Sequence, residues 1–268
     1  MNSYWENKVV LITGSCRGIG LEIGKQLLSL NACVVFHSKE TSLPKDETLS
    51  EAVEKGRAIH VQADVRKSVE VKDMISKIQN HFKQLDVVIN NAGISARATL
   101  EEITEETLKN VIDTNLYGPI WVTKAALPEL KKSQGSVFFI SSLAALYGIP
   151  NYLSYSISKS ALIPLQEGLN LELNEAGVHV GLIFLNFTEN DKDKYSLNAE
   201  GNKISIPHRN KFNPKSKDDT AKFIIKAVER KKHKVYSDNT GMIYRWVNFF
   251  FPSWVKKRQF KIFKESEN

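Results

Sequence analysis

Short, mostly apolar runs alternate with longer segments of mixed polarity along this 268-residue chain. Each run is bounded by polar residues, asparagine or glycine, which is typical of strands buried on both faces of a parallel sheet. The runs predict six strands, at residues 9–12, 34–36, 58–61, 87–89, 137–140 and 178–183.

Between these runs, apolar residues recur at helical spacing. Ile23, Leu27 and Leu30 share one face of a helix predicted over 19–30. Further helices are predicted over 68–82, 104–130 and 155–175. Strand alternating with helix predicts right-handed crossovers and helices on both faces of the sheet. The fold class is therefore α/β, a doubly wound parallel sheet in a three-layer α/β/α arrangement.

The organisation of the chain follows from its composition. No Pro-, Gly- or Ser-rich linker and no internal repeat divides it, so we expect one catalytic domain over residues 1–241. Residues 188–217 are polar and without a period, and we interpret them as a lid or substrate loop at the carboxyl edge of the sheet. Residues 242–268 form an aromatic and basic tail, in which Pro252 divides two short helices.

Three glycines, Gly14, Gly18 and Gly20, stand between the first predicted strand and the first helix. Glycine permits a tight turn and lets the backbone approach a pyrophosphate, and the free N–H groups of the helix N-terminus attract that phosphate. Glycines alone also occur in ordinary turns. The strand before them and the helix after them supply the context that a dinucleotide site requires.

Four motifs in fixed order extend this pattern. They are Thr13-Gly14-Ser15-Cys16-Arg17-Gly18-Ile19-Gly20, Asn90-Asn91-Ala92-Gly93, Ser142 and Tyr155-Ser156-Ile157-Ser158-Lys159. With this order and spacing, the chain resembles the short-chain dehydrogenase/reductase family from about residue 8 to 235. The resemblance implies a Rossmann-type fold and a nicotinamide dinucleotide held by the glycine loop, Ser15 and Ile19 included.

The resemblance also implies contacts further along the cofactor. Asp64 and Val65 are expected to hold the adenine, and the adenosine side is expected to be lined by Asn91, Ala92 and Gly93. After the last predicted strand, the family's usual Pro-Gly is replaced by Leu185 and Asn186. Thr188 remains within reach of the nicotinamide carboxamide, although the loop before it departs from the family's pattern.

The end of the second predicted strand favours NADP(H). An NAD site places a carboxylate there, which binds the ribose hydroxyls and repels a 2′-phosphate. The sequence has Phe36-His37-Ser38-Lys39 instead, without an acid. Arg17 and Lys39, beside Ser38, are cations that pair with a phosphate. The alternative is that both are ordinary surface cations.

The last motif predicts acid–base chemistry. Tyr155 and Lys159 are four residues apart, so they share one face of a helix. A phenol titrates near 10, and a cation one helical turn away lowers such a pKa toward neutrality. Tyr155 then serves as proton donor to a carbonyl oxygen while hydride is delivered to its carbon. The resemblance implies that Ser142 holds that oxygen, that Lys159 also binds the nicotinamide ribose beside Tyr155, and that Asn115 holds a relay water.

Pro164 lies inside the predicted catalytic helix and should kink its axis. Because it lies more than two turns after Tyr155, we expect the geometry of the Tyr155–Lys159 pair to survive.

Charge is concentrated at the C-terminal end. The chain carries a net charge of +7, but residues 203–268 hold 17 Lys/Arg against 6 Asp/Glu. In the tail, aromatic and basic residues interleave, as in an interfacial membrane segment, so an anionic membrane surface is a candidate partner. The alternative is that the tail packs on the body, walls the substrate pocket or forms a dimer contact. No groove-reading motif accompanies the charge, so nucleic acid is not an expected partner.

Composition adds the remaining expectations. Cys16 and Cys33 lack metal-like spacing, which indicates reduced thiols, no metal site and a cytoplasmic location, peripheral to a membrane if the tail binds one. We expect no signal peptide, N-terminal anchor or spanning segment, and we expect a homodimer or homotetramer. The tail also resembles those of membrane-associated family members acting on steroids, retinoids and other lipids, which implies a lipophilic substrate. We therefore expect an NADP(H)-dependent oxidoreductase that interconverts a ketone or aldehyde and an alcohol. The alternative is a dinucleotide-binding sensor or scaffold with weak or lost turnover.

Overall fold

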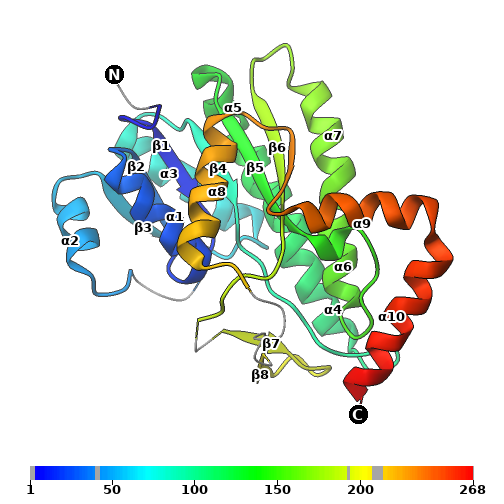
Figure 1. Ribbon diagram of the computed structural model, residues 1–268. Helices are drawn as coiled ribbons and strands as arrows, with labels where there is room; N and C mark the ends of the chain where they lie inside the picture. The colour runs from blue at the N-terminus through cyan, green and yellow to red at the C-terminus, as the bar shows by residue number, and fades with distance from the viewer. Residues whose placement is uncertain (1–3, 40–42, 192–193, 207–213, 268) are drawn as a thin grey trace.

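A seven-stranded, all-parallel sheet forms the centre of the protein (Figure 1). The computed structural model describes residues 4–39, 43–191, 194–206 and 214–267, with side chains at 240–242, 244–245, 259 and 261–267 outside the description. The strands are β1 (Val9–Ile12), β2 (Cys33–Ser38), β3 (Ala58–Gln62), β4 (Val87–Asn90), β5 (Ser136–Ser142), β6 (His179–Leu185) and β9 (Lys234–Tyr236). Their order, β3-β2-β1-β4-β5-β6-β9, reverses direction between β1 and β4. The predicted fold class is confirmed, and β9 is a strand that the apolar runs did not predict.

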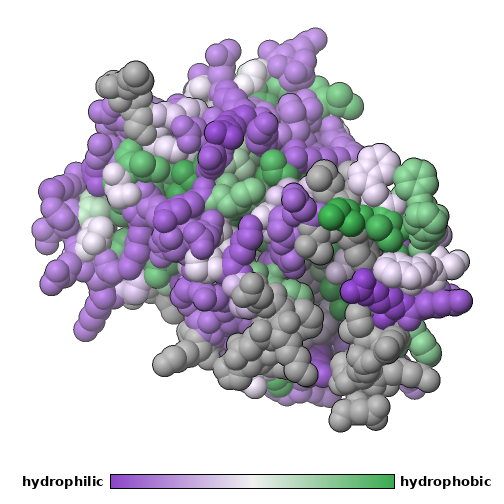
Figure 2. Space-filling model, viewed as in Figure 1, coloured by the Kyte–Doolittle hydropathy of each residue, from purple (hydrophilic) through white to green (hydrophobic). Residues whose placement is uncertain are grey.

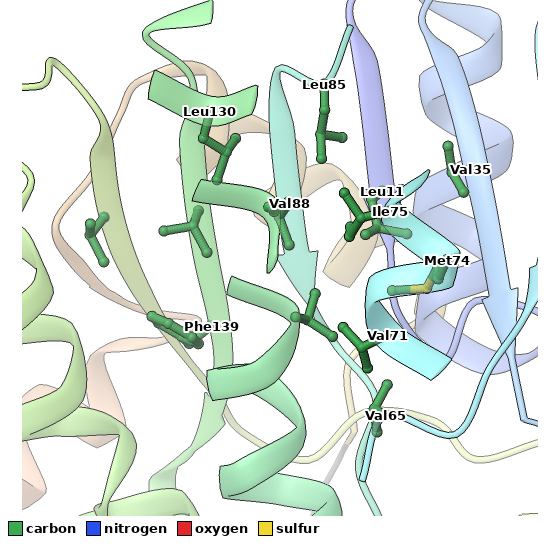
Figure 3. Packing of buried hydrophobic residues seen from close by; sticks show 14 of the residues in the cluster. Leu11, Val35, Val65, Val71, Met74, Ile75, Leu85, Val88, Leu130 and Phe139 are labelled. Atoms are coloured by element: carbon green, nitrogen blue, oxygen red, sulfur yellow. The ribbon is translucent and has the colours of Figure 1, made fainter. Parts of the chain in front are cut away.

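Helices cover both faces of this sheet. On one face lie α1 (Gly18–Ser29), α2 (Glu47–Glu54) and α8 (Lys217–Glu229), and on the other lie α3 (Ser68–Phe82), α5 (Gly118–Ser133) and α7 (Leu162–Glu172). Figure 3 shows the second interface, where Val71 and Met74 of α3 and Leu130 of α5 pack against Leu11 and Val88 of the sheet. Such continuous apolar strands are stable only when both faces are covered, which is the reason for three layers.

Small residues let α1 approach the sheet closely. A Cβ on Gly24 would lie 2.2 Å from Cε1 of Phe36 in β2, so no side chain fits at this position. Both residues are buried, and Phe36 is fully excluded from solvent. This contact fixes the height of α1 above the sheet, and with it the start of the helix that follows the glycine loop.

Two predicted helices are interrupted. The helix expected over 104–130 consists of α4 (Glu105–Ile112), a π-helical turn (Asp113–Tyr117) and α5. The helix expected over 155–175 divides at Ala161 into α6 (Leu153–Ser160) and α7. Pro164 explains this break, because its ring excludes the carbonyl of residue 160 from helical bonding. Tyr155 and Lys159 stay together on α6.

The predicted substrate loop contains a short hairpin. Strands β7 (Tyr195–Leu197) and β8 (Lys203–Ser205) pair antiparallel, which corrects the interpretation of 188–217 as irregular. Residues 192–193 and 207–213 of this loop lie outside the described residues. The hairpin is anchored to the segment after β4, since Leu197 N donates to Ser95 O and Arg97 N donates to Leu197 O. The loop thus lies over the edge of the sheet where the motifs gather.

The C-terminal tail consists of α9 (Asn239–Phe250) and α10 (Pro252–Glu267), with Pro252 as the first residue of α10. Among the described residues, large apolar side chains stand exposed on both helices and between them, namely Ile243, Trp246, Phe249, Phe250, Phe251, Trp254 and Phe260. At the right of Figure 2, green apolar atoms of this region stand beside purple basic ones. A search of the described residues finds no helix that is long and apolar enough to cross a membrane.

Candidate active site

The motifs meet at one edge of the sheet, because parallel strands bring all their carboxyl ends together. The glycine turn follows β1, Lys39 follows β2, Asp64 follows β3, Asn91 follows β4, and Ser142 is the last residue of β5. This edge, at the reversal between β1 and β4, is where open α/β sheets bind ligands.

The glycine turn leaves no room for side chains. Gly14 and Gly18 have φ of +63° and +60°, in the left-handed region that favours glycine. A Cβ on Gly20 would lie 2.6 Å from Asn91 Nδ2 and from the carbonyl oxygen of Gly14. Glycine at 14 and 20 therefore lets the turn pack against Ala92 and Asn91, and the turn leads into the N-terminus of α1, whose free N–H groups suit a pyrophosphate.

Asn91 holds this turn against β4. Its Nδ2 donates to the carbonyls of Thr13 (2.9 Å) and Gly14 (3.0 Å), and Thr13 Oγ1 accepts from the amides of Asn91 and Ala92. The predicted Asn91 and Ala92 thus lie beside the glycine turn. Gly93 comes next, and its missing side chain lets Lys159 Nζ approach to 3.3 Å of the position that a Cβ would take.

Ser15 forms its hydrogen bonds within the protein. It is fully buried, its amide donates to the carbonyl of His37 (2.8 Å), and its Oγ donates to Ile12 O (2.6 Å) and accepts from His37 N (2.9 Å). Both donors are used within the protein, so Ser15 supports the turn and offers none to a phosphate. Ile19, also predicted to contact the cofactor, is partly buried against the core beneath α1.

The predicted adenine site is held by an ion pair that sequence reasoning missed. Arg66 Nε donates to both Asp64 oxygens (2.9 and 3.0 Å) and Nη2 donates to Oδ2 (2.6 Å), while Nη1 reaches Asn110. Burial of Asp64 favours its neutral form, but the Arg66 hydrogen bonds outweigh burial and lower the pKa of Asp64 to about 2. Val65 is buried in the core against Gly118.

The proposed phosphate selectors lie around this region. Lys39 Nζ is 3.6 Å from Asp64 Oδ2, with about half of its side chain exposed. Ser38 Oγ lies 2.9 Å from His60 Nε2. Arg17 is exposed, and its guanidinium lies 5.1 Å from the ring centroid of Tyr195 in β7. Tyr195 was not predicted, because only the folded hairpin brings residue 195 to the glycine turn.

Tyr155 and Lys159 lie on α6, next to the end of β5. Lys159 is 5 % exposed, its Nζ donates to the carbonyl of Ile140 (2.9 Å), and the same nitrogen lies 5.9 Å from the Tyr155 ring centroid. Burial lowers the pKa of Lys159 to about 8. The Lys159 carbonyl accepts from Ser141 Oγ (3.1 Å), so α6 is bonded to β5 at both ends of this lysine.

Asn115 connects α6 to the segment after β4. It lies in the π-helical turn, fully buried, and its Oδ1 accepts from Ile94 N (2.8 Å). Its Nδ2 donates to Ile94 O (2.8 Å) and Ser158 Oγ (3.0 Å), and Ser158 Oγ in turn donates to the Tyr155 carbonyl (2.8 Å). The Asn115 side chain is therefore occupied by Ile94 and Ser158.

Ser142 and Thr188 occupy different surroundings. Ser142 is half-buried at the end of β5, and its Oγ accepts from Ala144 N (3.2 Å). Thr188 is buried, and its Oγ1 lies 3.3 Å from Thr220 Oγ1 on α8, so the structure turns this hydroxyl toward α8. In place of the Pro-Gly, Asn186 bonds the segment after β9, with Nδ2 donating to Asp238 (2.6 Å) and its amide donating to Ser237 Oγ.

Comparison with known proteins agrees with this arrangement. A family model described as short chain dehydrogenase matches residues 8–200. Over 201 residues, the chain is 32 % identical to 11-beta-hydroxysteroid dehydrogenase 1A of Arabidopsis thaliana, covering 74 % of this chain and 57 % of that protein. It is also 32 % identical to a 3-oxoacyl-[acyl-carrier-protein] reductase of Synechocystis, covering 81 % and 88 %. In fold, it matches a short chain dehydrogenase/reductase from Burkholderia phymatum crystallised with NAD, with a TM-score of 0.79 at 18 % identity over 94 % and 96 % of the two chains.

Proposed function

Because the chain belongs to the short-chain dehydrogenase family, we propose that it is an NADP(H)-dependent oxidoreductase that interconverts a ketone or aldehyde and an alcohol. The observation that carries this proposal is that hydrogen bonds bring the motifs together at one edge of the sheet. Asn115 bonds α6 through Ser158, and Lys159 of α6 bonds the Ile140 carbonyl in β5. At the same edge, Thr13 of the glycine turn bonds Ala92 after β4. When bound, the nicotinamide group gives or takes the hydride. The residues of the chain position the substrate and move the proton.

Each role follows from position. Tyr155 donates its phenolic proton to the carbonyl oxygen during reduction, and takes it back during oxidation. The buried Lys159 ammonium favours the phenolate and binds the nicotinamide ribose. Ser142, half-exposed at the strand end, hydrogen-bonds the same substrate oxygen. The Asn115 side chain is occupied by Ile94 and Ser158, so we assign the relay water to the Asn115 backbone carbonyl. This water returns a proton to Tyr155 after the phenol has donated its own.

The choice of NADP(H) rests on charge. Residues Phe36 to Lys39, at the end of β2, contain no acid that would repel a 2′-phosphate. Arg17 and Lys39 are exposed cations at the same edge of the sheet, and Lys39 also lies 3.6 Å from Asp64; a dianionic 2′-phosphate would attract both cations. The glycine turn leads into the N-terminus of α1, whose free N–H groups suit a pyrophosphate.

Replacing Tyr155 by Phe tests the proposal. The change keeps the ring and removes the proton donor, so turnover should fall by about 10²–10⁴-fold while NADPH still binds. The measurement is NADPH absorbance with a panel of carbonyl substrates, beside NADPH titration by fluorescence. Tyr152→Phe, three residues earlier, is the matched control and should stay active. Retention of a tenth of wild-type activity in Tyr155→Phe contradicts the proposal, and a wild-type protein that binds NADPH but reduces nothing favours the sensor.

We extend the proposal to a lipophilic substrate and an anionic membrane surface as the partner of the tail. Trp246 is 59 % and Phe249 76 % exposed, although such side chains are normally buried. Lys256, Lys257 and Arg258 follow on α10, all exposed. Aromatic rings enter the headgroup boundary of a bilayer, and clustered cations are attracted to lipid phosphates. Lipid-soluble substrates collect at the same surface.

Sedimentation with vesicles tests this partner. Replacing Lys256, Lys257 and Arg258 by Ala removes roughly 1 kcal/mol of attraction per cation, so binding to phosphatidylserine-containing vesicles should fall on the order of 100-fold. The exposed triplet 230–232, Arg-Lys-Lys at the end of α8, is the matched control and should leave binding unchanged when replaced. If the full-length protein ignores these vesicles at low salt, the tail is a packing or dimer element.

Self-association and location complete the proposal. Tyr117, Ile157 and Leu171 are exposed apolar side chains on the segments around α5, α6 and α7, which supports a homodimer or homotetramer. Sedimentation velocity measures this directly. The chain has two cysteines, Cys16 and Cys33, without metal-like spacing, which supports a reducing, cytoplasmic compartment; localisation of a tagged protein tests this.

A further inference from the structure

A buried histidine joins three strand ends beneath the dinucleotide site. His37, near the end of β2, is 2 % exposed. Its Nδ1 accepts from the amide of Gly14 (3.1 Å), in the turn after β1. Its Nε2 lies 3.0 Å from the carbonyl oxygen of Ala63, after β3 and directly before Asp64. One ring therefore bonds both the glycine turn and the segment of the predicted adenine site.

These partners determine the tautomer. The Gly14 amide is a donor, so Nδ1 must present a lone pair. The Ala63 carbonyl is an acceptor, so Nε2 must carry the hydrogen. Only the neutral Nε2–H form satisfies both bonds, and burial, which lowers the pKa of His37 to about 4, favours that form.

The backbone of His37 strengthens the connection. Its carbonyl accepts from the Ser15 amide, and its own amide donates to Ser15 Oγ, which in turn donates to Ile12 O. Three hydrogen bonds thus link residues 14–15 with residue 37, and two of them involve Ser15. Only the bond from Gly14 uses the histidine side chain, at the residue whose φ of +63° opens the turn.

We propose that His37 is a positioning residue for the cofactor: its Nδ1 holds the Gly14 amide so that the glycine turn keeps the shape that receives the pyrophosphate. The inference rests on the dinucleotide site proposed above. His37 touches neither substrate nor reacting atoms. It acts through Gly14, and the second bond, to Ala63, holds the ring in place.

Two substitutions separate the two ring nitrogens. In His37→Asn the amide oxygen takes the place of Nδ1, so the acceptor for Gly14 is kept and the donor to Ala63 is lost. In His37→Gln the amide nitrogen takes the place of Nε2, so the donor to Ala63 is kept and the acceptor for Gly14 is lost. Each variant loses one buried bond, so a general loss of stability affects both alike.

The assay is fluorescence titration of NADPH and NADH with each variant, beside melting curves and kcat at saturating cofactor. We expect His37→Asn to bind within about threefold of wild type, and His37→Gln to bind both dinucleotides at least about tenfold more weakly, with kcat unchanged. Hydrogen exchange at the Gly14 amide should be faster in His37→Gln alone. Equal affinity of the two variants overturns the inference. Wild-type protein that binds neither dinucleotide overturns the proposed function and this inference together.

Discussion

Replacing the buried Lys159 by Met should abolish turnover and change the pH dependence of stability. The Lys159 ammonium is 5 % exposed, and burial lowers its pKa from 10.5 to about 8. Met has a similar length and no charge, so the replacement removes the cost of burying the cation. It also leaves the carbonyl of Ile140 without its donor, a loss that does not vary with pH.

The magnitude follows from proton linkage. A shift of one pKa unit corresponds to about 1.4 kcal/mol, so in the wild-type protein the buried ammonium costs roughly 3 kcal/mol of stability below pH 8. Between about pH 8 and 10.5 the unfolded chain binds this proton more tightly than the folded protein does. The contribution of Lys159 to the free energy of unfolding of the wild-type protein therefore rises with pH in that window. The Met variant lacks this rise.

Urea unfolding of the two cofactor-free proteins, at about pH 7.5 and 9.5, measures the effect. The free energy of unfolding of Lys159→Met, minus that of wild type, should fall by ~2 kcal/mol between these pH values. The other titrating groups are present in both proteins and cancel. A difference that stays constant with pH refutes the reasoning, since it would mean that Lys159 keeps its ordinary pKa in the folded protein.

Two further predictions concern cofactor choice and packing. Replacing Arg17 and Lys39 together by Ala should weaken NADPH by on the order of 100-fold and NADH little, because only NADPH carries the 2′-phosphate; equal weakening in titrations of both cofactors means that these cations do not read it. Gly24→Ala places a Cβ 2.2 Å from the Phe36 ring and should lower the free energy of unfolding by about 1–3 kcal/mol. The matched control is Gly168→Ala in α7, where a Cβ meets nothing within 4 Å; it should raise the free energy of unfolding by about 0.5–1 kcal/mol. Denaturant curves in which both substitutions change the free energy of unfolding in the same direction contradict the packing argument.

Local pattern was sufficient for most of the scaffold. Helix α3 spans the predicted 68–82, and each of the six predicted strands is present within three residues at either end. These elements are long or strongly apolar, so their periodicity dominates the choice of conformation. Strand β9 is short and half-buried, and its residues Lys234 and Tyr236 carry no apolar run, so it forms because the edge of β6 offers backbone partners.

The sequence predicted only one of the two helix interruptions. Pro164 predicted a kink, and the structure moves the break upstream to Ala161, one helical turn before the ring. The π-helical turn at 113–117 has no such signal. It occurs where Asn115 must reach Ile94 and Ser158 at once, which is a tertiary requirement. The hairpin at 195–205 likewise depends on docking against residues 95–97.

By itself, the sequence determined the order of strands and helices, the glycine turn and the four motifs, because these depend on neighbours a few residues apart. Only the tertiary structure decided how their side chains are used. Asn91 supports a turn 77 residues away, Ser15 bonds β2, and Lys159 is buried deeply enough to lower its pKa. His37 acquires its role from Gly14 and Ala63, which are distant in sequence. Hydrogen-bond partners and solvent exclusion arise only when separate strand ends meet, so no local pattern encodes them.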